Sequence, residues 1–154
     1  MKEFLLKNIA YEHWANVQLL RAIEQSGTTD ERTLQLMAHL LASPALWLHR
    51  VRKETPPFGL WPTLSLDECR ALNEQNAQQW TEWLTQSSAE ELQSYVVVKV
   101  PATGQEKKLM IQDAVQHSSN HGSYHRGQII LRLKGLIDPL PLTTYIAFAL
   151  EDLA

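Results

Sequence analysis

Long segments with helical periodicity make up most of this chain of 154 residues, and its six glycines and seven prolines fall mostly between them. Within these segments apolar residues recur every three to four positions, which places them on one face of an α-helix. The segments cover roughly residues 2–25, 28–51, 65–86 and 111–134. The pattern predicts an all-α fold in which four long helices form a four-helix bundle, with residues 1–154 as a single domain.

Two short motifs predict where helices begin. Thr28-Thr-Asp-Glu31 and Ser65-Leu-Asp-Glu68 both have the capping-box pattern, in which a hydroxyl and a carboxylate satisfy free amides of the first turn.

Residues 95–100 and 106–110 predict a small β-hairpin before the last long helix, and residues 144–153 predict a short C-terminal helix.

The second helical segment is apolar nearly all round and contains Pro44. A helix without a polar face lies at the centre of a fold or is covered by a second subunit, so we expect a homodimer. Proline inside a helix removes one backbone hydrogen bond, which predicts a bend or a local opening of the helix at Pro44.

The composition argues against several classes of function. The net charge is −3 with both signs interspersed, so the chain offers no basic patch to a nucleic-acid backbone. No apolar run approaches the length of a membrane span, and the first residues lack the apolar core of a signal peptide. The single Cys69 excludes an internal disulfide, and a packing role in its helix is favoured over a nucleophilic one. We therefore expect a cytoplasmic protein that binds neither nucleic acid nor membrane.

Half of the six histidines lie in the last long helix, at positions 117, 121 and 125. At about 100° per residue, His125 falls within the apolar face, His121 toward its edge and His117 on the rim. Residues four apart on a helix are close enough for one metal ion to bind both imidazoles, so His121 and His125 are candidate ligands. The small Gly122 and Ser118 leave room around such a site.

A catalytic zinc-like site requires a third protein ligand, which must come from another helix. His13, His39 and His49 are the candidates; His39 has the more enclosed neighbours, but periodicity alone does not choose among them. The H-E-x-x-H motif of zinc proteases is disfavoured because Gly122 stands where the general-base glutamate would be. The alternative is that two core histidines are purely structural and have hydrogen-bond partners only.

Three segments of the chain resemble the DinB family, within the broader DinB/YfiT-like superfamily. Residues 120–129, NHGSYHRGQI, are similar to the C-terminal signature of the family, and the H-x-x-x-H-R-G-Q string within them is fairly specific. Residues 11–17 are similar to the opening helix of the family, and residues 39–48 to the second-helix segment that carries the first ligand.

The resemblance implies a four-helix bundle, usually dimeric, that holds a divalent metal ion through three histidines. Zinc or nickel is favoured because three-imidazole sites accept these ions. On this sequence those positions are His39, His121 and His125. Characterised relatives include thiol-dependent transferases and isomerases, and the family was first noted as DNA-damage-inducible, which implies a role in a stress response. The chain departs from the family pattern where Pro44 replaces a frequent acidic residue and where Thr144-Tyr145 replaces Asp-Tyr.

Three neutral imidazoles leave a bound metal ion its full charge and an open face, which lowers the pKa of a bound water or thiol. We favour a thiol S-transferase, in which a metal-activated low-molecular-weight thiol attacks a small electrophile. A metal-dependent hydrolase of a small molecule is the competing enzyme. A non-catalytic, stress-induced metal-binding dimer is the alternative without turnover.

Several other residues are expected near the ligands. Arg126 and Gln128 are candidates to orient the ligand helix, although a structural salt bridge is an equally good role for Arg126. His117 is a candidate outer proton carrier, and a solvated rim position is favoured. Four aromatic residues are candidates for a pocket mouth, although filling the core or a dimer seam is favoured; they are Trp14, Trp47, Trp61 and Tyr124.

Overall fold

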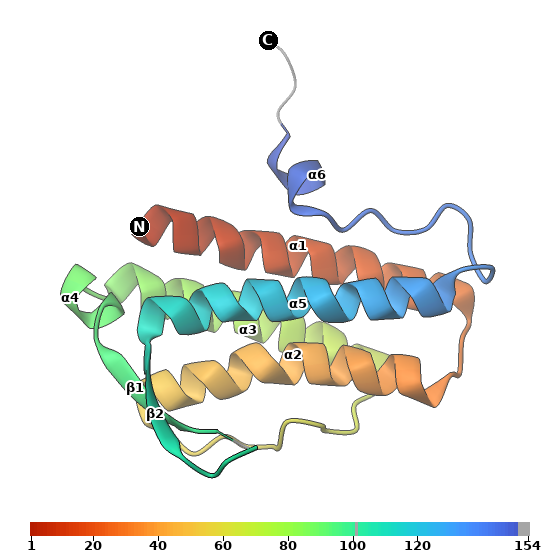
Figure 1. Ribbon diagram of the computed structural model, residues 1–154. Helices are drawn as coiled ribbons and strands as arrows, with labels where there is room; N and C mark the ends of the chain where they lie inside the picture. The colour runs from red at the N-terminus through yellow and green to blue at the C-terminus, as the bar shows by residue number, and fades with distance from the viewer. Residues whose placement is uncertain (101, 151–154) are drawn as a thin grey trace.

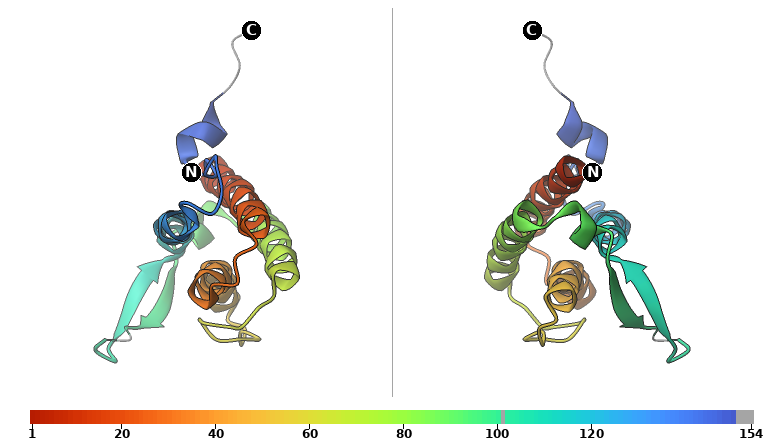
Figure 2. Two further views of the ribbon diagram at one scale, coloured as in Figure 1. Left: turned by 90° about the vertical axis from the view of Figure 1, so that its right-hand side faces the viewer. Right: turned by 90° about the vertical axis from the view of Figure 1, so that its left-hand side faces the viewer.

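The computed structural model describes residues 1–100 and 102–150 and consists mainly of four long helices (Figure 1). They are α1 (Lys2–Ser26), α2 (Glu31–Arg52), α3 (Leu66–Gln86) and α5 (Ile111–Leu133). Viewed along the bundle, the helices form a ring in the order α1, α3, α2, α5 (Figure 2). The predicted all-α four-helix bundle is therefore confirmed.

α2 and α3 run in the same direction, and this sets the path of the chain between them (Figure 1). Residues 53–65 have to return along the bundle from the end of α2 to the start of α3. A helix the length of α2 spans about 33 Å, and an extended chain covers at most about 3.3–3.6 Å per residue. This segment, which we call the crossover, is therefore drawn out along the outer side of α2.

Hydrogen bonds show which residues begin the helices. Ser65 accepts from the amide of Glu68, and the Glu68 carboxylate accepts from the amide of Ser65, which confirms the second predicted capping box. The first predicted box is wrong, because the N-cap of α2 is Asp30. Its carboxylate accepts from the amide and the hydroxyl of Thr33 and also pairs with Arg132 of α5, so one side chain caps α2 and joins two helices.

Shorter elements surround the bundle. α4 (Ala89–Leu92) leads into an antiparallel hairpin of β1 (Tyr95–Lys99) and β2 (Glu106–Met110), as predicted. α6 (Tyr145–Ala149) packs on α1 near the end of the described chain. The predicted C-terminal helix extended to residue 153, but α6 ends at Ala149, and residues 151–154 lie outside the described residues.

The apolar side chains of α2 are nearly all buried, whichever way they point. α3 and α5 pack on either side of α2, and Phe58 and Leu64 of the crossover pack against the same core. The apolar side chains on all sides of α2 are therefore covered within one chain and do not by themselves require a second subunit. No helix among residues 1–100 and 102–150, α2 included, is long and apolar enough to cross a membrane.

Pro44 lies in the middle of α2 without interrupting it. Proline has no amide hydrogen, so the carbonyl of Leu40 loses its helical partner. α3 supplies two side-chain donors at this level of the bundle. Asn76 Nδ2 donates to the oxygen of Leu41 at 2.8 Å, and Trp80 Nε1 donates to the oxygen of Pro44 at 3.0 Å. These bonds tie the proline turn to α3. Of the two predicted effects, the local opening does not occur, and a bend at Pro44 stays a prediction.

Candidate metal centre

Three histidine side chains converge between α2 and α5. His39 comes from α2, and His121 and His125 come from successive turns of α5. One ring nitrogen of each residue lies within 4.8 Å of the other two, and the Nε2 atoms of His39 and His121 are 3.2 Å apart. The burial along α5 follows the helical-wheel prediction, because His125 is buried, His121 is half-buried and His117 is exposed. Of the three candidates for the third position, the structure therefore brings His39 to the α5 pair.

The outer nitrogens of two of these rings are held by oxygen acceptors. Nδ1 of His39 donates to the main-chain oxygen of Leu60 at 2.9 Å, and Nδ1 of His125 donates to Oε1 of Gln128 at 2.8 Å. Because a carbonyl oxygen can only accept, each bond places the ring hydrogen on Nδ1 and leaves Nε2 of the neutral ring as an acceptor, which in His39 faces Nε2 of His121. Nδ1 of His121 is buried and has no partner among the described residues.

The environment of the cluster favours neutral imidazoles. The pKa of His121 falls to about 3, mainly because the ring is buried and further because of the neighbouring rings of His125, His39 and His117. Burial also lowers the pKa of His39, against the opposing effect of its hydrogen bond to Leu60, and burial lowers the pKa of His117. His39, His117 and His121 are therefore neutral at pH 7, the form in which imidazole binds a metal ion.

The geometry of the cluster fits a divalent metal ion. Zinc–imidazole bonds are about 2.0–2.1 Å long, so two nitrogens of one tetrahedral site lie about 3.3–3.4 Å apart. The 3.2 Å between the Nε2 atoms of His39 and His121 is close to that separation. Metal-binding histidines usually donate their other N–H to a carbonyl or carboxylate, as His39 and His125 do here. Three protein nitrogens leave one position of a tetrahedral ion for a further ligand.

The crossover contacts His39 through Leu60 and Trp61. Trp61 stacks on the His39 ring, with centroids 3.7 Å apart and planes only 7° apart. The guanidinium of Arg32 lies 5.1 Å from the centre of the Trp61 ring, and the neighbouring Leu60 supplies the acceptor for Nδ1. Trp61 is 49 % exposed, so it forms an outer wall of the site. A core position for this tryptophan is therefore wrong, and a dimer seam stays a prediction.

A cavity of about 340 Å³ lies beside His121. α2 lines it with Trp47 and Arg50, α5 lines it with His117 and His121, and the hairpin closes it with residues 98–100. The His117 ring meets Trp47 edge to face at 5.7 Å and lies 5.5 Å from the His121 ring, centre to centre. His117 is thus an exposed rim residue, as predicted, and also part of the cavity wall.

The remaining aromatic candidates divide between two environments. Trp14 is half-buried and packs against Phe148 of α6, as expected of a packing residue. Tyr124 is 65 % exposed on α5, and its ring centre lies 5.0 Å from that of His125. The preference for a core position is therefore wrong for Tyr124, and a dimer seam stays a prediction.

Other reactive side chains lie outside the cluster. Nε2 of His13 is 2.8 Å from the carboxylate of Glu74, and Nδ1 of His49 donates to the oxygen of Ala45 one helical turn earlier. Cys69 is buried, and burial raises the pKa of its thiol to about 11. This thiol is protonated at neutral pH and packs in the core, as predicted.

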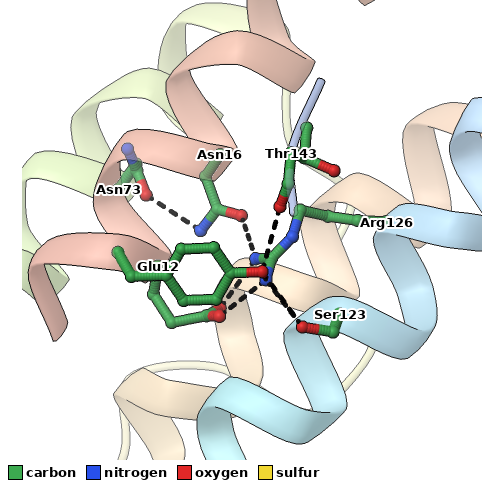
Figure 3. A network of polar contacts seen from close by, with 7 residues as sticks. Glu12, Asn16, Asn73, Ser123, Arg126 and Thr143 are labelled. Atoms are coloured by element: carbon green, nitrogen blue, oxygen red, sulfur yellow. Dashed lines mark hydrogen bonds and ion pairs between the residues drawn. The ribbon is translucent and has the colours of Figure 1, made fainter. Parts of the chain in front are cut away.

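The Arg126 side chain of α5 points toward α1 (Figure 3). It is 1 % exposed, and its two terminal nitrogens donate to the two carboxylate oxygens of Glu12 at 2.8 and 2.7 Å. The other acceptors of Arg126 are Asn16, Tyr11 and Ser123. Adjacent residues on a helix are about 100° apart, so Arg126 anchors the face of α5 next to the one that carries His125. Of its two predicted roles, Arg126 has that of the structural salt bridge.

Gly122 provides the space for this ion pair. A Cβ atom at position 122 would overlap the Glu12 carboxylate and would lie 2.9 Å from Nη1 of Arg126. The expectation that Gly122 leaves room around the metal site is therefore wrong, because Glu12 occupies that room. Burial raises the pKa of Glu12, and the hydrogen bond and charge of Arg126 oppose this shift.

The sequence matches the family model of the DinB family over residues 1–150. The chain belongs to the DinB family. Comparison with curated proteins and with solved structures gives no significant match. The three converging histidines all lie within the matched residues, and together with family membership they fit a metal-binding DinB protein.

Spacing within the chain gave no indication of Leu60 or Glu12, and it did not predict that Trp61, a candidate for a pocket mouth, would stack on His39. For Leu60 and Trp61, the available signal was the proline-rich and aromatic composition of the segment between the second and third helices. For Glu12, it was the position of this carboxylate inside the segment that resembles the opening helix of the family.

Proposed function

We propose that this DinB protein binds a divalent metal ion, zinc or nickel, through Nε2 of His39, His121 and His125, and transfers a low-molecular-weight thiol to a small electrophile. The convergence of three ring nitrogens beside a cavity is the observation that carries the proposal. A divalent ion held there supplies a Lewis acid, which lowers the pKa of a coordinated thiol and raises the fraction of thiolate at neutral pH.

The residues of the chain hold and shield this centre. Leu60 and Gln128 accept hydrogen bonds from Nδ1 of His39 and of His125. These bonds orient the two rings so that their Nε2 atoms face the proposed metal position. Trp61 covers one face of His39 and limits the access of water from that side. In the transfer, the thiol loses its proton to solvent and its sulfur bonds to the electrophilic carbon. The leaving group departs with the electrons of its former bond to that carbon.

The arrangement of carboxylates supports thiol transfer over hydrolysis. Hydrolysis of the zinc-protease type uses a glutamate as general base beside the metal ion. No carboxylate is among the residues that line the cavity beside His121, and Glu12 is engaged by Arg126 on another face of α5. A thiolate is itself the nucleophile and needs no separate base during the attack.

The test mixes metal-loaded protein with several biological thiols and a generic electrophile such as 1-chloro-2,4-dinitrobenzene. Thiol-dependent loss of the electrophile, abolished in His125→Ala and retained in His13→Ala, is the expected result. His13 is the matched control because its ring pairs with Glu74, outside the cluster. Hydrolysis product formed without thiol points to the hydrolase, and tight stoichiometric metal without either reaction points to a non-catalytic metal-binding protein.

The identity of the metal is best obtained from protein purified without an affinity tag. Elemental analysis should find about one zinc or nickel ion per chain, because three imidazole ligands suit these borderline ions. The double variant His121→Ala/His125→Ala should contain none. Equal metal content in the variant and the wild type would place the metal elsewhere on the chain.

A further inference from the structure

One face of α2 contributes more lining residues to the cavity beside His121 than any other element. Ser43, Leu46, Trp47 and Arg50 line it, and their spacing of three, one and three residues keeps them on the same side of the helix. The surface that faces the cavity is predominantly apolar, with aliphatic and aromatic side chains from α2 and from residues 98–100 of the hairpin. His117 and His121 stand on the opposite side, on α5. The cavity therefore connects the histidine cluster with the C-terminal end of α2.

Arg50 is the charged side chain that faces this cavity. Its guanidinium lies 4.7 Å from the centre of the Trp47 ring, and within the described residues it forms no ion pair. Lys99 also borders the cavity, but strand alternation puts it on the opposite face of the hairpin from Val98, directly across from Glu106. No aspartate or glutamate lines the cavity. An unpaired guanidinium that rests on an indole beside apolar walls is a typical receptor for one carboxylate.

The distance between Arg50 and the histidine cluster determines how long a ligand must be to contact both. Arg50 follows His39 by eleven residues on α2, which corresponds to about 16 Å along the helix axis. Helical side chains lean toward the N-terminus, and the contact with Trp47 shows that the Arg50 side chain does so. Arg50 contacts Trp47, Trp47 contacts His117, and His117 contacts His121, so the guanidinium is on the order of 10–15 Å from the His121 ring. A single amino acid is too short to span that gap, whereas a molecule with an apolar middle of several atoms spans it.

We propose that this cavity binds an elongated small organic anion, whose carboxylate pairs with Arg50 and whose other end reaches the histidine cluster. The carboxylate accepts two parallel hydrogen bonds from the guanidinium, and the apolar middle lies against Leu46, Trp47 and Val98. Any reaction of the ligand at the histidine cluster rests on the proposed function. Recognition of the carboxylate does not depend on that reaction.

Titration of ¹⁵N-labelled protein, followed by amide chemical shifts, tests the site. The ligands are hexanoate, its uncharged analogue hexanamide, and 6-sulfanylhexanoate, in the presence and absence of zinc. Hexanoate should shift amides near Trp47, Arg50 and residues 98–100, and should bind about tenfold or more tightly than hexanamide, because a charge-assisted bidentate pair is lost in the amide. Arg50→Gln should remove this preference. Lys99→Gln, which makes the same change of charge at the cavity border, should retain it.

The possible outcomes separate the two proposals. A carboxylate preference that depends on Arg50 supports the anion site, even if no thiol is ever transferred. Equal affinity for hexanoate and hexanamide, a preference that survives Arg50→Gln, or no shift around the cavity at millimolar ligand overturns it, even if thiol transfer is observed. If the thiol end of the ligand reaches the histidine cluster, 6-sulfanylhexanoate should bind more tightly than hexanoate, and only when zinc is present.

Discussion

The carboxylate of Glu12 occupies the space in which a side chain at Gly122 would stand. Gly122 lies between the two histidines of α5, so the helix that carries them is joined to α1 by the buried pair of Glu12 and Arg126. The face with Gly122 and Arg126 secures α5 against α1, and the face with His121 and His125 is thereby held opposite α2. Gly122 therefore makes room for the ion pair of Glu12 and Arg126 that joins α5 to α1.

Gly122→Ala should destabilise the protein by about 2–4 kcal/mol. Alanine favours a helix over glycine by roughly 1 kcal/mol, but its methyl group displaces a buried ion pair, and disrupting such a pair costs about 3–5 kcal/mol. Gly127→Ala is the matched control, because a Cβ atom there meets no other atom within 4 Å, and it should be neutral or stabilising. Urea unfolding of both variants measures the difference. Equal stabilities would show that the space at position 122 is not needed.

Gln128→Ala should weaken metal binding by about tenfold, because outer hydrogen-bond partners of ligand histidines typically contribute about 10–100-fold to affinity. Gln128→Glu should preserve or increase affinity, since a carboxylate is a stronger acceptor for Nδ1 of His125. Gln112→Ala, on the same helix and distant from the cluster in sequence, serves as the control. Competition with a chromogenic chelator measures all three variants. An unchanged affinity in Gln128→Ala would mean that this bond does not orient the ligand.

The metal-free protein should lose stability as the pH falls from about 6.5 toward about 3. A histidine in the unfolded chain takes up a proton near its ordinary pKa of 6.5, whereas His121 in the folded protein does so only near 3. Between these values the unfolded state binds more protons, so lowering the pH favours unfolding. His121→Gln should flatten this dependence in thermal unfolding curves recorded across the range. A wild-type curve independent of pH would contradict a buried neutral ring.

Metal affinity should also fall as the pH drops below about 6, since protons and metal ions compete for the same imidazole nitrogens. The fall should be less steep than for three exposed histidines, because the lowered pKa values of His39 and His121 leave these rings largely unprotonated. Isothermal titration with zinc at a series of pH values measures the effect. Affinity that is constant into the acid range would exclude histidine ligands.

We propose a homodimer, on the basis of the family resemblance and of apolar side chains that remain exposed on one chain. Leu131 of α5 is 71 % exposed, and Ile146 of α6 is 64 % exposed. Sedimentation velocity should detect a dimer at micromolar concentration, and at least one of Leu131→Lys and Ile146→Lys should shift it toward monomer. A wild-type monomer at this concentration would refute the prediction.

The parts of the site that depend on one helix were predictable from the sequence. The order of burial from His125 to His121 to His117 follows from the helical period alone, because all three residues share one backbone geometry. The capping box at Ser65 was predictable for the same reason, since its partner is three residues away.

The parts that join distant segments were not predictable. Leu60 reaches His39 because α2 and α3 are parallel, and periodicity does not determine the relative direction of two helices. Glu12 and Arg126 are 114 residues apart, and a charge in an amphipathic helix is by default expected at the surface. The capping prediction at the start of α2 was wrong for a related reason, because the ion pair with Arg132 contributes to the role of Asp30.

Because α2 and α3 are parallel, the residues that stabilise the fold and the residues that contact the candidate ligand His39 lie partly in different segments. The first are in the long helices, and the second include the crossover. The long helices supply the fully buried core, whereas the orientation and basicity of His39 are influenced by the crossover, which packs against that core only through partly buried side chains such as Phe58 and Leu64. Substitutions in residues 53–65 can therefore change the reactivity of the centre while the scaffold is conserved. Diversification of activity on this architecture is expected to concentrate in that connection.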